Sequence, residues 1–397
     1  MRHPGTVQGG WSIVALFIGG REYMDVRPCG PAHLRSLTGL RFFAAMGVVL
    51  YHLSLYFPPL DHTLDAFGYG FTGVSFFFVL SGFVLTWSHR EGDSARKFYR
   101  NRFARVWPLH AVTTFLSTLV PPLATSATIW PALPFVLTLT QAWVPAGGYV
   151  VAFNGISWSL SCEAFFYLSF PFLIRIVSKE QKTGLLAVFV YGSIMALGIY
   201  VSMSLSGPAA SYLLGTMPLY RLGEFVVGMC LALMIKRGWR PRLRLGRAVG
   251  VTLGLYVALM VASIVTSGGA VPVPATYANF VMIPGFVAVI AAAATNDLRG
   301  TGKGPASKTM VRLGRWSFAL YLVHELVIRF AKPLVEGLDN MGALAVSALV
   351  VVASLGMSGL LHEFVESPGE KWLRSAGKQK TWPSDEPTAP QGIGSSP

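Results

Sequence analysis

Apolar runs of close to twenty residues recur along almost the whole 397-residue chain, and they restrict the folds that it can adopt. About twenty apolar residues in a helix cross the hydrocarbon core of a bilayer. Because every backbone polar group in lipid needs a partner within the protein, only helices and closed barrels span it. Hydrophobic residues make up 53% of the chain and charged residues 13%, with a mean hydropathy of +0.52. The chain is therefore predicted to be an all-α polytopic membrane helix bundle.

About ten transmembrane helices are predicted from these runs, in one membrane domain over residues 35–374. The predicted spans are residues 38–57, 67–88, 107–121, 157–174, 184–205, 217–235, 248–266, 277–295, 316–331 and 341–361. The segment Ile129–Trp143 is also apolar, but prolines interrupt and flank it, and a full crossing would place a later basic loop on the wrong side. It is predicted to be re-entrant or interfacial, as non-helical backbone is tolerated where it is buried in protein.

Lysine and arginine are distributed unevenly between the loops, and this bias sets the predicted orientation. The loop 89–106 contains six of these residues, whereas the loop 58–66 contains none. Because cytoplasmic loops are enriched in Lys and Arg, the basic loops and both chain termini are predicted to be cytoplasmic, in a multi-pass protein of the plasma membrane. The net charge of +14 thus reports topology, and nucleic acid is not an expected partner.

The two ends of the chain differ from the membrane domain. Residues 1–34 contain an apolar stretch that is too short to span, without a convincing cleavage site after it. They are predicted to form an N-terminal arm, with Met24 as an alternative start of the protein. Residues 375–397 are rich in Gly, Ser, Pro and Lys, a composition typical of disorder, and predict a cytoplasmic tail.

Arg41 and His52 stand eleven residues apart in one apolar run. At about 100° per residue they share one face of a helix, about 16 Å apart along its axis. Ionisable groups in a lipid-spanning helix are costly and indicate function. His52 is predicted to be a general base or an acyl carrier, with a structural hydrogen bond as the alternative. Arg41 is predicted either to contact phosphate or to anchor the helix at the cytoplasmic side.

Two further ionisable residues are expected near His52. Glu163 in the fourth span is predicted to orient or charge-stabilise the histidine, or else to neutralise a buried arginine. His324 lies near the middle of the ninth span and either binds substrate or ties helices together. With the predicted topology, the three side chains converge in one cavity.

Two charged pairs complete the set of candidate residues. Arg102 and Arg105 lie one turn apart at the cytoplasmic mouth of the third span, where they either report topology or bind the phosphates of a donor such as acyl-coenzyme A. Arg221 and Glu224, three residues apart in the sixth span, are predicted to neutralise one another. The three cysteines lack the spacing of metal ligands or disulfides, so no metal is predicted.

These elements form an ordered set that resembles the acyltransferase 3 family of membrane O-acyltransferases. The resemblance covers most of the chain, and the order of the elements makes it specific. The matching elements are Arg41 and His52 with ten residues between them, Phe76–Phe83, Arg102 and Arg105 before Pro108, Trp158–Glu163, Arg221–Phe225, Tyr321–His324 and Glu366–Pro368.

The resemblance implies an enzyme of roughly ten helices that moves an acetyl or other short acyl group from acyl-coenzyme A to a hydroxyl of a carbohydrate or sugar-bearing molecule. It implies that Arg41 and His52 are essential and that Arg102 and Arg105 serve the donor. Many relatives carry an additional extracytoplasmic hydrolase-like domain, for which this chain has no room. The acceptor is then a lipid-linked glycan, a surface polysaccharide served with a separate extracytoplasmic transferase, or a small natural product such as a glycosylated macrolide.

A polytopic transporter or exporter of a lipid-linked or small-molecule substrate is the rival prediction from composition. Transporters also place charges near the midplane of the membrane, but many are built from two corresponding halves with broken helices. The two halves of this sequence do not resemble one another. The enzyme is therefore the favoured prediction.

Overall fold

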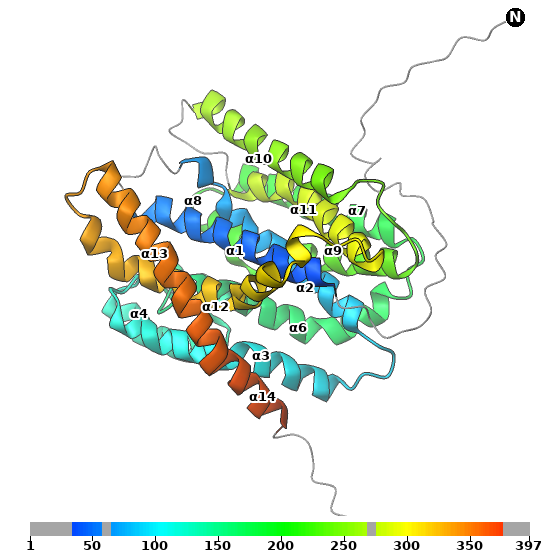
Figure 1. Cartoon of the computed structure of the whole chain (residues 1–397), viewed down its shortest axis with the longest axis horizontal. Helices are drawn as coiled ribbons and strands as arrows, with labels where there is room; N and C mark the ends of the chain where they lie inside the picture. Colours follow the sequence, from blue (N-terminus) through cyan, green and yellow to red (C-terminus); the bar gives the residue numbers. More distant parts are fainter. Residues whose placement is uncertain (1–33, 58–64, 268–274, 376–397) are drawn as a thin grey trace, which may run out of the picture.

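Long helices that lie side by side make up the described part of the chain, which in this computed structural model comprises residues 34–57, 65–267 and 275–375 (Figure 1). Within those residues there is no β-strand, and eight helices are long and apolar enough to cross a membrane. The prediction of an all-α polytopic membrane protein is confirmed. The predicted arm and tail, with Met24 and Cys29, lie outside the described residues, apart from Leu34 and Ser375.

Ten long helices overlap the ten predicted spans. They are α1 (Arg35–Tyr56), α2 (Gly73–Ser88), α3 (Ala95–Leu116), α6 (Trp158–Val177), α7 (Thr183–Ser204), α9 (Pro218–Lys236), α10 (Leu245–Ser267), α11 (Ala275–Leu298), α12 (Lys308–Ala331) and α13 (Asn340–Leu361). Shorter helices are α4 (Ser126–Leu137), α5 (Gly147–Val150), α8 (Gly207–Ser211) and α14 (Ser367–Ser375), and π-helical turns at Tyr212–Thr216 and His362–Glu366 lead into α9 and α14.

Two of the long helices begin well before their predicted spans. The predicted loop 89–106 is largely the first three turns of α3, and α12 begins at Lys308 rather than near residue 316. The Ser307 hydroxyl caps α12 by accepting a hydrogen bond from the backbone N–H of Met310 (3.3 Å). Charged residues reduce the hydropathy of these turns without weakening helix formation, because Arg and Lys are good helix formers. A hydropathy pattern therefore places the start of such helices too late.

The apolar segment that was not counted as a crossing folds into α4. Its twelve residues extend about 18 Å, well short of the roughly 30 Å of hydrocarbon. Pro131 and Pro134 lie within it, and Gln141–Trp143 continue as a 3₁₀ turn. The segment is too short for a full crossing, and its re-entrant or interfacial placement stays a prediction.

The centre of the bundle is built from α1, α2, α9, α11 and α12, with α7 and α10 on the outside (Figure 1). Of an apolar stretch of 18 residues in each helix, 89% is buried in α9 but only 11% in α7 and in α10. The last two helices therefore present most of their surface to the surroundings. Glycines allow the central helices to cross closely. A Cβ on Gly82 would collide with the carbonyl of Phe225, and one on Gly228 with that of Val79, as expected for helix contacts in membranes.

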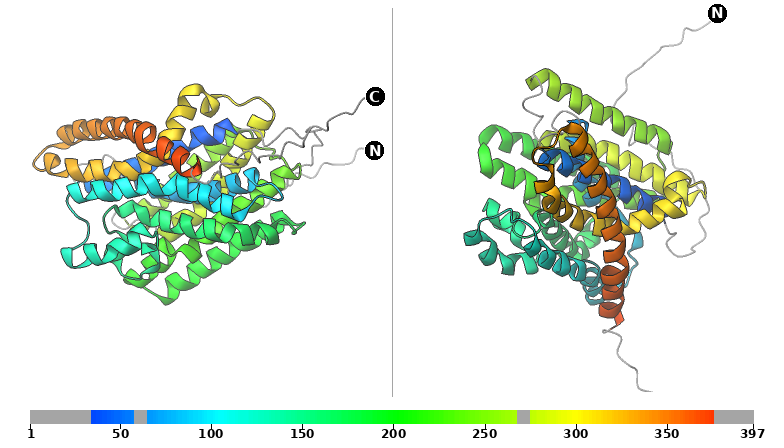
Figure 2. Two further views of the ribbon diagram at one scale, coloured as in Figure 1. Left: turned by 90° about the horizontal axis from the view of Figure 1, so that it is seen from below. Right: turned by 60° about the vertical axis from the view of Figure 1, so that its left-hand side comes forward.

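The connections gather at the two ends of the bundle (Figure 2). The turns α2–α3, α6–α7, α9–α10 and α11–α12 lie toward one end, whereas α4, α5 and the turn α12–α13 lie toward the other. The first group contains the basic loops. The assignment of that end to the cytoplasm, like the exact number of crossings, stays a prediction from the charge bias.

Candidate functional site

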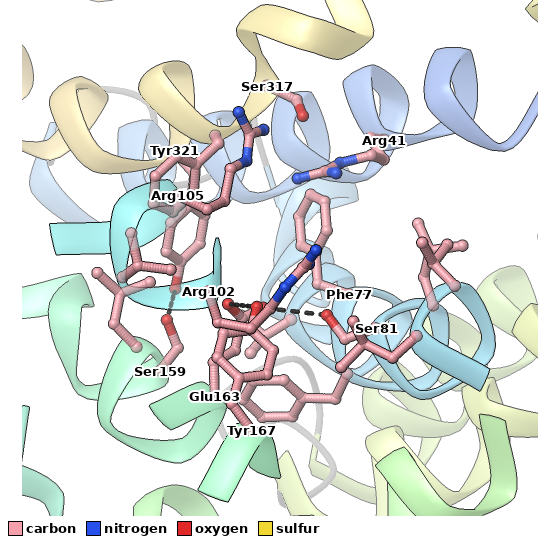
Figure 3. Close-up of a pocket in the computed structure, with 18 residues that line it drawn as sticks. Arg41, Phe77, Ser81, Arg102, Arg105, Ser159, Glu163, Tyr167, Ser317 and Tyr321 are labelled. Carbon is pink, nitrogen blue, oxygen red and sulfur yellow. Dashed lines mark hydrogen bonds between the residues drawn. The ribbon is translucent and has the colours of Figure 1, made fainter. Parts of the chain in front are cut away.

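A cavity of about 100 Å³ lies among the side chains of α1, α2, α3, α6 and α12 (Figure 3). We call it the arginine cavity, because Arg41 of α1 and Arg102 and Arg105 of α3 point into it from different sides. Glu163 of α6 and Tyr321 of α12 also line it. The structure thus brings together four charged residues that the sequence had singled out on three separate segments.

Arg41 and Arg102 are the two arginines of this cavity without an anionic partner. Neither makes a hydrogen bond or ion pair with another described residue, and the Nε atom of each is buried without a hydrogen-bond partner. Each guanidinium lies over an aromatic ring. That of Arg41 is 6.0 Å from the ring centre of Phe77, and that of Arg102 is 5.9 Å from the ring centre of Phe98. Such groups are expensive to bury without a counter-charge, so the cavity is suited to an anion.

Arg105 differs from these two arginines because it is paired with carboxylates of the last described helical segment. Its guanidinium forms ion pairs with Glu366 of the second π-helical turn and with Glu370 of α14, the latter at 3.2 Å. Glu366 also accepts a hydrogen bond from Nδ1 of His362 (3.0 Å). The predicted phosphate fork of Arg102 with Arg105 is therefore not available as a free pair. The two guanidinium groups of the cavity that make no ion pair within the described residues are those of Arg41 and Arg102.

Glu163 belongs to the arginine cavity and not to the histidines. Its carboxylate accepts hydrogen bonds from the hydroxyls of Tyr167 (2.8 Å) and Ser81 (3.2 Å), and Arg41 is close enough to interact with it electrostatically (Figure 3). The prediction that it orients His52 is therefore wrong. Arg41, in the N-terminal half of α1, is the residue of that helix whose charge acts on Glu163, and the alternative role, partial neutralisation of a buried arginine, fits the geometry.

His52 instead pairs with His324. Nε2 of His324 lies 3.2 Å from Nδ1 of His52, in the interior between α1 and α12. Each Nδ1 also faces a backbone carbonyl of its own helix, Val48 for His52 (2.9 Å) and Leu320 for His324 (3.0 Å). Because a carbonyl oxygen only accepts, each neutral ring carries its proton on Nδ1.

The direction of this hydrogen-bond chain leaves one nitrogen available. His324 donates from Nδ1 to Leu320, so its Nε2 lone pair accepts from Nδ1–H of His52. Nε2 of His52 then carries a lone pair, and it has no hydrogen-bond partner in the described part of the chain. A neutral imidazole in this state can accept a proton or attack a carbonyl carbon.

Glu325 is the carboxylate that does lie near His52. It accepts a hydrogen bond from the hydroxyl of Tyr56 (2.8 Å), one turn along α1 from His52, and it interacts electrostatically with the His52 ring. The loop before α6 holds it in place: a Cβ on Gly155 would collide with its carboxylate, and Arg329 donates to the carbonyl of Phe153 (2.8 Å). Glu325 follows His324 directly in the sequence, and no role was predicted for it.

Aromatic side chains separate the arginine cavity from the histidine pair. Phe77 and Tyr321 both line the cavity, and their ring centres lie 6.1 Å apart. The Tyr321 ring lies 6.0 Å from that of His324, and its hydroxyl is hydrogen-bonded to that of Ser159 (2.8 Å). His52 does not line the cavity. The predicted convergence of all three ionisable side chains in one cavity is thus wrong, since only the two histidines meet.

Arg221 and Glu224 form the internal pair that was predicted. Their side chains are buried and joined by a 3.0 Å ion pair, and Arg221 also donates to the hydroxyl of Ser75 (3.1 Å). The guanidinium lies 5.1 Å from the centre of Phe78. These contacts tie α9 to α2 and place the pair outside the arginine cavity.

Comparisons with known proteins find similar sequences over most of the chain. A family profile described as an acyltransferase domain matches residues 34–362. The acyltransferase MdmB of Streptomyces mycarofaciens is 36% identical over 368 residues, which covers 84% of this chain and 91% of that protein. The O-acetyltransferase OatA of Staphylococcus aureus is 24% identical over 86% of this chain, which corresponds to 58% of its own, longer sequence. No solved structure matches significantly.

Proposed function

This chain belongs to the acyltransferase 3 family of membrane O-acyltransferases, and we propose that it moves an acetyl or other short acyl group from acyl-coenzyme A to a hydroxyl of a carbohydrate or a sugar-bearing small molecule. The family assignment makes it an enzyme, so a transporter or exporter is no longer the competing interpretation. The donor, the acceptor and the roles of individual residues are the content of the proposal.

The observation that carries the donor assignment is that the guanidinium groups of Arg41 and Arg102 share one cavity and make no ion pair within the described residues. Acyl-coenzyme A has several phosphate groups, and guanidinium groups bind phosphate through strong, charge-assisted hydrogen bonds. Glu163, held by Ser81 and Tyr167, offsets part of the positive charge of the cavity. A phosphate between Arg41 and Arg102 would replace that partial compensation.

His52 is the proposed general base. Its Nε2 lone pair takes the proton of the acceptor hydroxyl while the oxygen bonds to the thioester carbon; the carbon–sulfur bond then breaks, and the thiol leaves with the same proton. His324 accepts the Nδ1–H of His52 (3.2 Å) and so stabilises the imidazolium that forms between these steps. Attack by Nε2 itself, which would make His52 an acyl carrier, uses the same free lone pair.

The distance between the two sites fits a long flexible donor. Arg41 and His52 are eleven residues apart on α1, or about 16 Å along the axis. With its phosphates near Arg41 and Arg102, the donor would extend its pantetheine arm past Phe77 and Tyr321 toward His52. These two rings must shift for the thioester to pass, because they close the inner end of the cavity.

The acceptor is proposed to reach His52 from the opposite end of the bundle or laterally from the membrane. Tyr56 and Glu325 lie on that side of the histidine pair and can hydrogen-bond hydroxyl groups of a sugar. The relative OatA is named as an O-acetyltransferase, which favours an acetyl group for this chain as well. We place the enzyme in the plasma membrane, where a separate extracytoplasmic transferase would be needed if the final acceptor is a surface polymer.

Transfer of a labelled acyl group by the purified protein tests the proposal. Wild-type protein should transfer label from acyl-coenzyme A to a hydroxylated sugar or glycoside, and His52→Ala should lose this activity while remaining folded. His110→Phe is a matched control, because His110 is a buried histidine that hydrogen-bonds a carbonyl away from the site (2.8 Å to Val136). A lack of transfer to every acceptor, or full activity of His52→Ala, would overturn the proposal.

Two further measurements define the chemistry. Arg41→Lys and Arg102→Lys should each raise KM for acyl-coenzyme A, because lysine keeps the charge but lacks the planar set of donors. Label retained on wild-type protein without acceptor, and absent from His52→Ala, would identify an acyl-histidine instead of a general base. Deleting the gene and comparing glycans and secreted metabolites by mass spectrometry for a lost acyl increment would identify the acceptor and the acyl group together.

A further inference from the structure

A second and larger cavity, of about 750 Å³, lies at the end of the bundle where α2 ends and α3 begins. We call it the mouth cavity. Its walls come from the last turn of α2, the turn 89–94, the first turns of α3, and the C-terminal turns of α6 and α9. Its size is within the range of small-molecule sites, and neither the sequence motifs nor the family comparisons assign it a ligand.

The mouth cavity adjoins the arginine cavity. Leu85 of α2 and Arg102 of α3 line both of them. A ligand that occupies the arginine cavity can therefore extend past Arg102 into the mouth cavity. The arginine cavity, at about 100 Å³, is too small to hold a whole nucleotide and its phosphates, so most of a donor such as acyl-coenzyme A must lie elsewhere.

The cations of the mouth cavity are available for a ligand. Lys97 of α3 and Arg175 of α6 line it and make no ion pair within the described residues. Lys236 is engaged in part, since its ammonium donates to the carbonyls of Thr86 (2.8 Å) and His89 (3.1 Å) at the end of α2.

The carboxylates of the mouth cavity are fewer than its cations. Asp93 already accepts a hydrogen bond from the backbone N–H of Arg90 (2.9 Å) and lies 3.8 Å from His89. Burial lowers the pKa of His89, so this ring is neutral near pH 7 and is not one of the cavity's cations. Glu91 is the other carboxylate that lines the cavity. Together with Arg102, the surplus of positive charge favours an anionic ligand.

An aromatic surface accompanies these charges. The rings of Phe98 and Phe170 both line the cavity and are stacked, with centres 5.1 Å apart and planes inclined by 23°. Asn101, one turn from Phe98 on α3, adds an amide that can both donate and accept. Flat rings beside cations and an amide are the combination that binds a base and its phosphates.

We propose that the mouth cavity binds the phosphorylated nucleotide part of the acyl donor, with phosphates between Lys97, Arg175 and Arg102 and the base against Phe98 and Phe170. This inference rests on the proposed use of acyl-coenzyme A. It assigns Arg102 to the junction, where the nucleotide ends and the pantetheine arm enters the arginine cavity. The nucleotide is thereby bound in the mouth cavity, away from the thioester that reacts.

Two donors that differ only in the nucleotide test this assignment. Initial rates are measured with acyl-coenzyme A and with the corresponding acyl-pantetheine for wild-type protein, Lys97→Gln, Arg175→Gln and the double variant. Each single variant should raise KM for acyl-coenzyme A about 10-fold, with kcat and KM for acyl-pantetheine unchanged. Arg96→Gln and Lys179→Gln are matched controls, because each removes a neighbouring exposed charge that does not line the cavity.

The outcomes separate the inference from the proposed function. An unchanged KM for acyl-coenzyme A in the double variant, or an equal rise for both donors, would overturn the nucleotide site while leaving the donor assignment intact. The site is equally refuted if wild-type protein uses the two donors with the same KM. A wild-type protein that uses neither donor would instead contradict the proposed function. All four substituted side chains are exposed, so loss of folding is not expected.

Discussion

Replacing His324 tests the proposed hydrogen-bond chain most directly. His324→Phe keeps an aromatic ring at this buried position but removes the acceptor that lies 3.2 Å from Nδ1 of His52. The carbonyl of Val48 still accepts from Nδ1–H (2.9 Å), so the tautomer of His52 should survive. What is lost is the acceptor that stabilises the imidazolium after His52 has taken a proton.

The size of the effect follows from that one bond. A hydrogen bond to a charged group contributes about 1.5–3 kcal/mol. At about 1.36 kcal/mol per factor of ten in rate, kcat should fall by about 10- to 150-fold, less than the loss expected when His52 itself is removed. KM for acyl-coenzyme A should change by less than about twofold, because the bond strengthens only when the imidazolium forms.

The assay compares His324→Phe with His324→Gln at saturating acyl-coenzyme A. The amide oxygen of glutamine can accept from His52, so this variant should recover most of kcat. Spectra of ¹⁵N-labelled histidine, assigned by the loss of one signal in a His52 variant, should show His52 protonated on Nδ1 in wild type and in His324→Phe. An unchanged kcat in His324→Phe, an equal fall in both variants, or a rise in KM alone would refute the positioning role.

Three other predictions use different parts of the bundle. Glu163→Gln should change kcat by less than about fivefold, because the amide oxygen still accepts from one of the two hydroxyls of Ser81 and Tyr167 and the amide NH2 can donate to the oxygen of the other, whereas a general base would cost about 10²–10⁴-fold. Arg221→Met should cost about 3–5 kcal/mol of stability by leaving Glu224 buried without its partner; thermal unfolding in detergent should show the loss, and the double substitution to Met should restore most of it. Phe77→Ala should raise the ratio of kcat/KM for butyryl over acetyl donors about 10-fold by opening the inner end of the cavity; an unchanged ratio would contradict the assigned path.

Much of the fold was predictable because a helix that crosses lipid needs a long run of apolar residues. Apolar runs of membrane length appear as helices, and the interrupted segment appears as the short α4. The starts of α3 and α12 were not predictable in this way, since their first turns are helical but charged. Hydropathy reports which residues prefer lipid, and helix formation follows from propensity and capping instead.

Most residues of the candidate site could be singled out from the sequence, but not which of them contact one another. Periodicity places Arg41 and His52 on one face of α1, and the spacing of Arg221 and Glu224 predicts their ion pair. Which residues of two helices meet depends on the rotation and the depth of each helix in the bundle. The sequence of a single segment specifies neither. The carboxylate that acts electrostatically on His52 is Glu325 of α12, whereas Glu163 of α6 accepts from Ser81 and Tyr167.

The ion pairs of Arg105 show why the three arginines of the cavity would not be three equivalent ligands for the proposed donor phosphates. Three uncompensated guanidinium groups in a partly buried site would repel one another and lose hydration. Glu366 and Glu370 remove one of the three from that competition, and they join α14 to α3 in doing so. The remaining pair comes from two different helices, Arg41 on α1 and Arg102 on α3, so an anion that binds both must bridge these helices. Donor binding is therefore expected to draw α1 and α3 together around the arginine cavity, while α14 holds the other guanidinium of α3 in place.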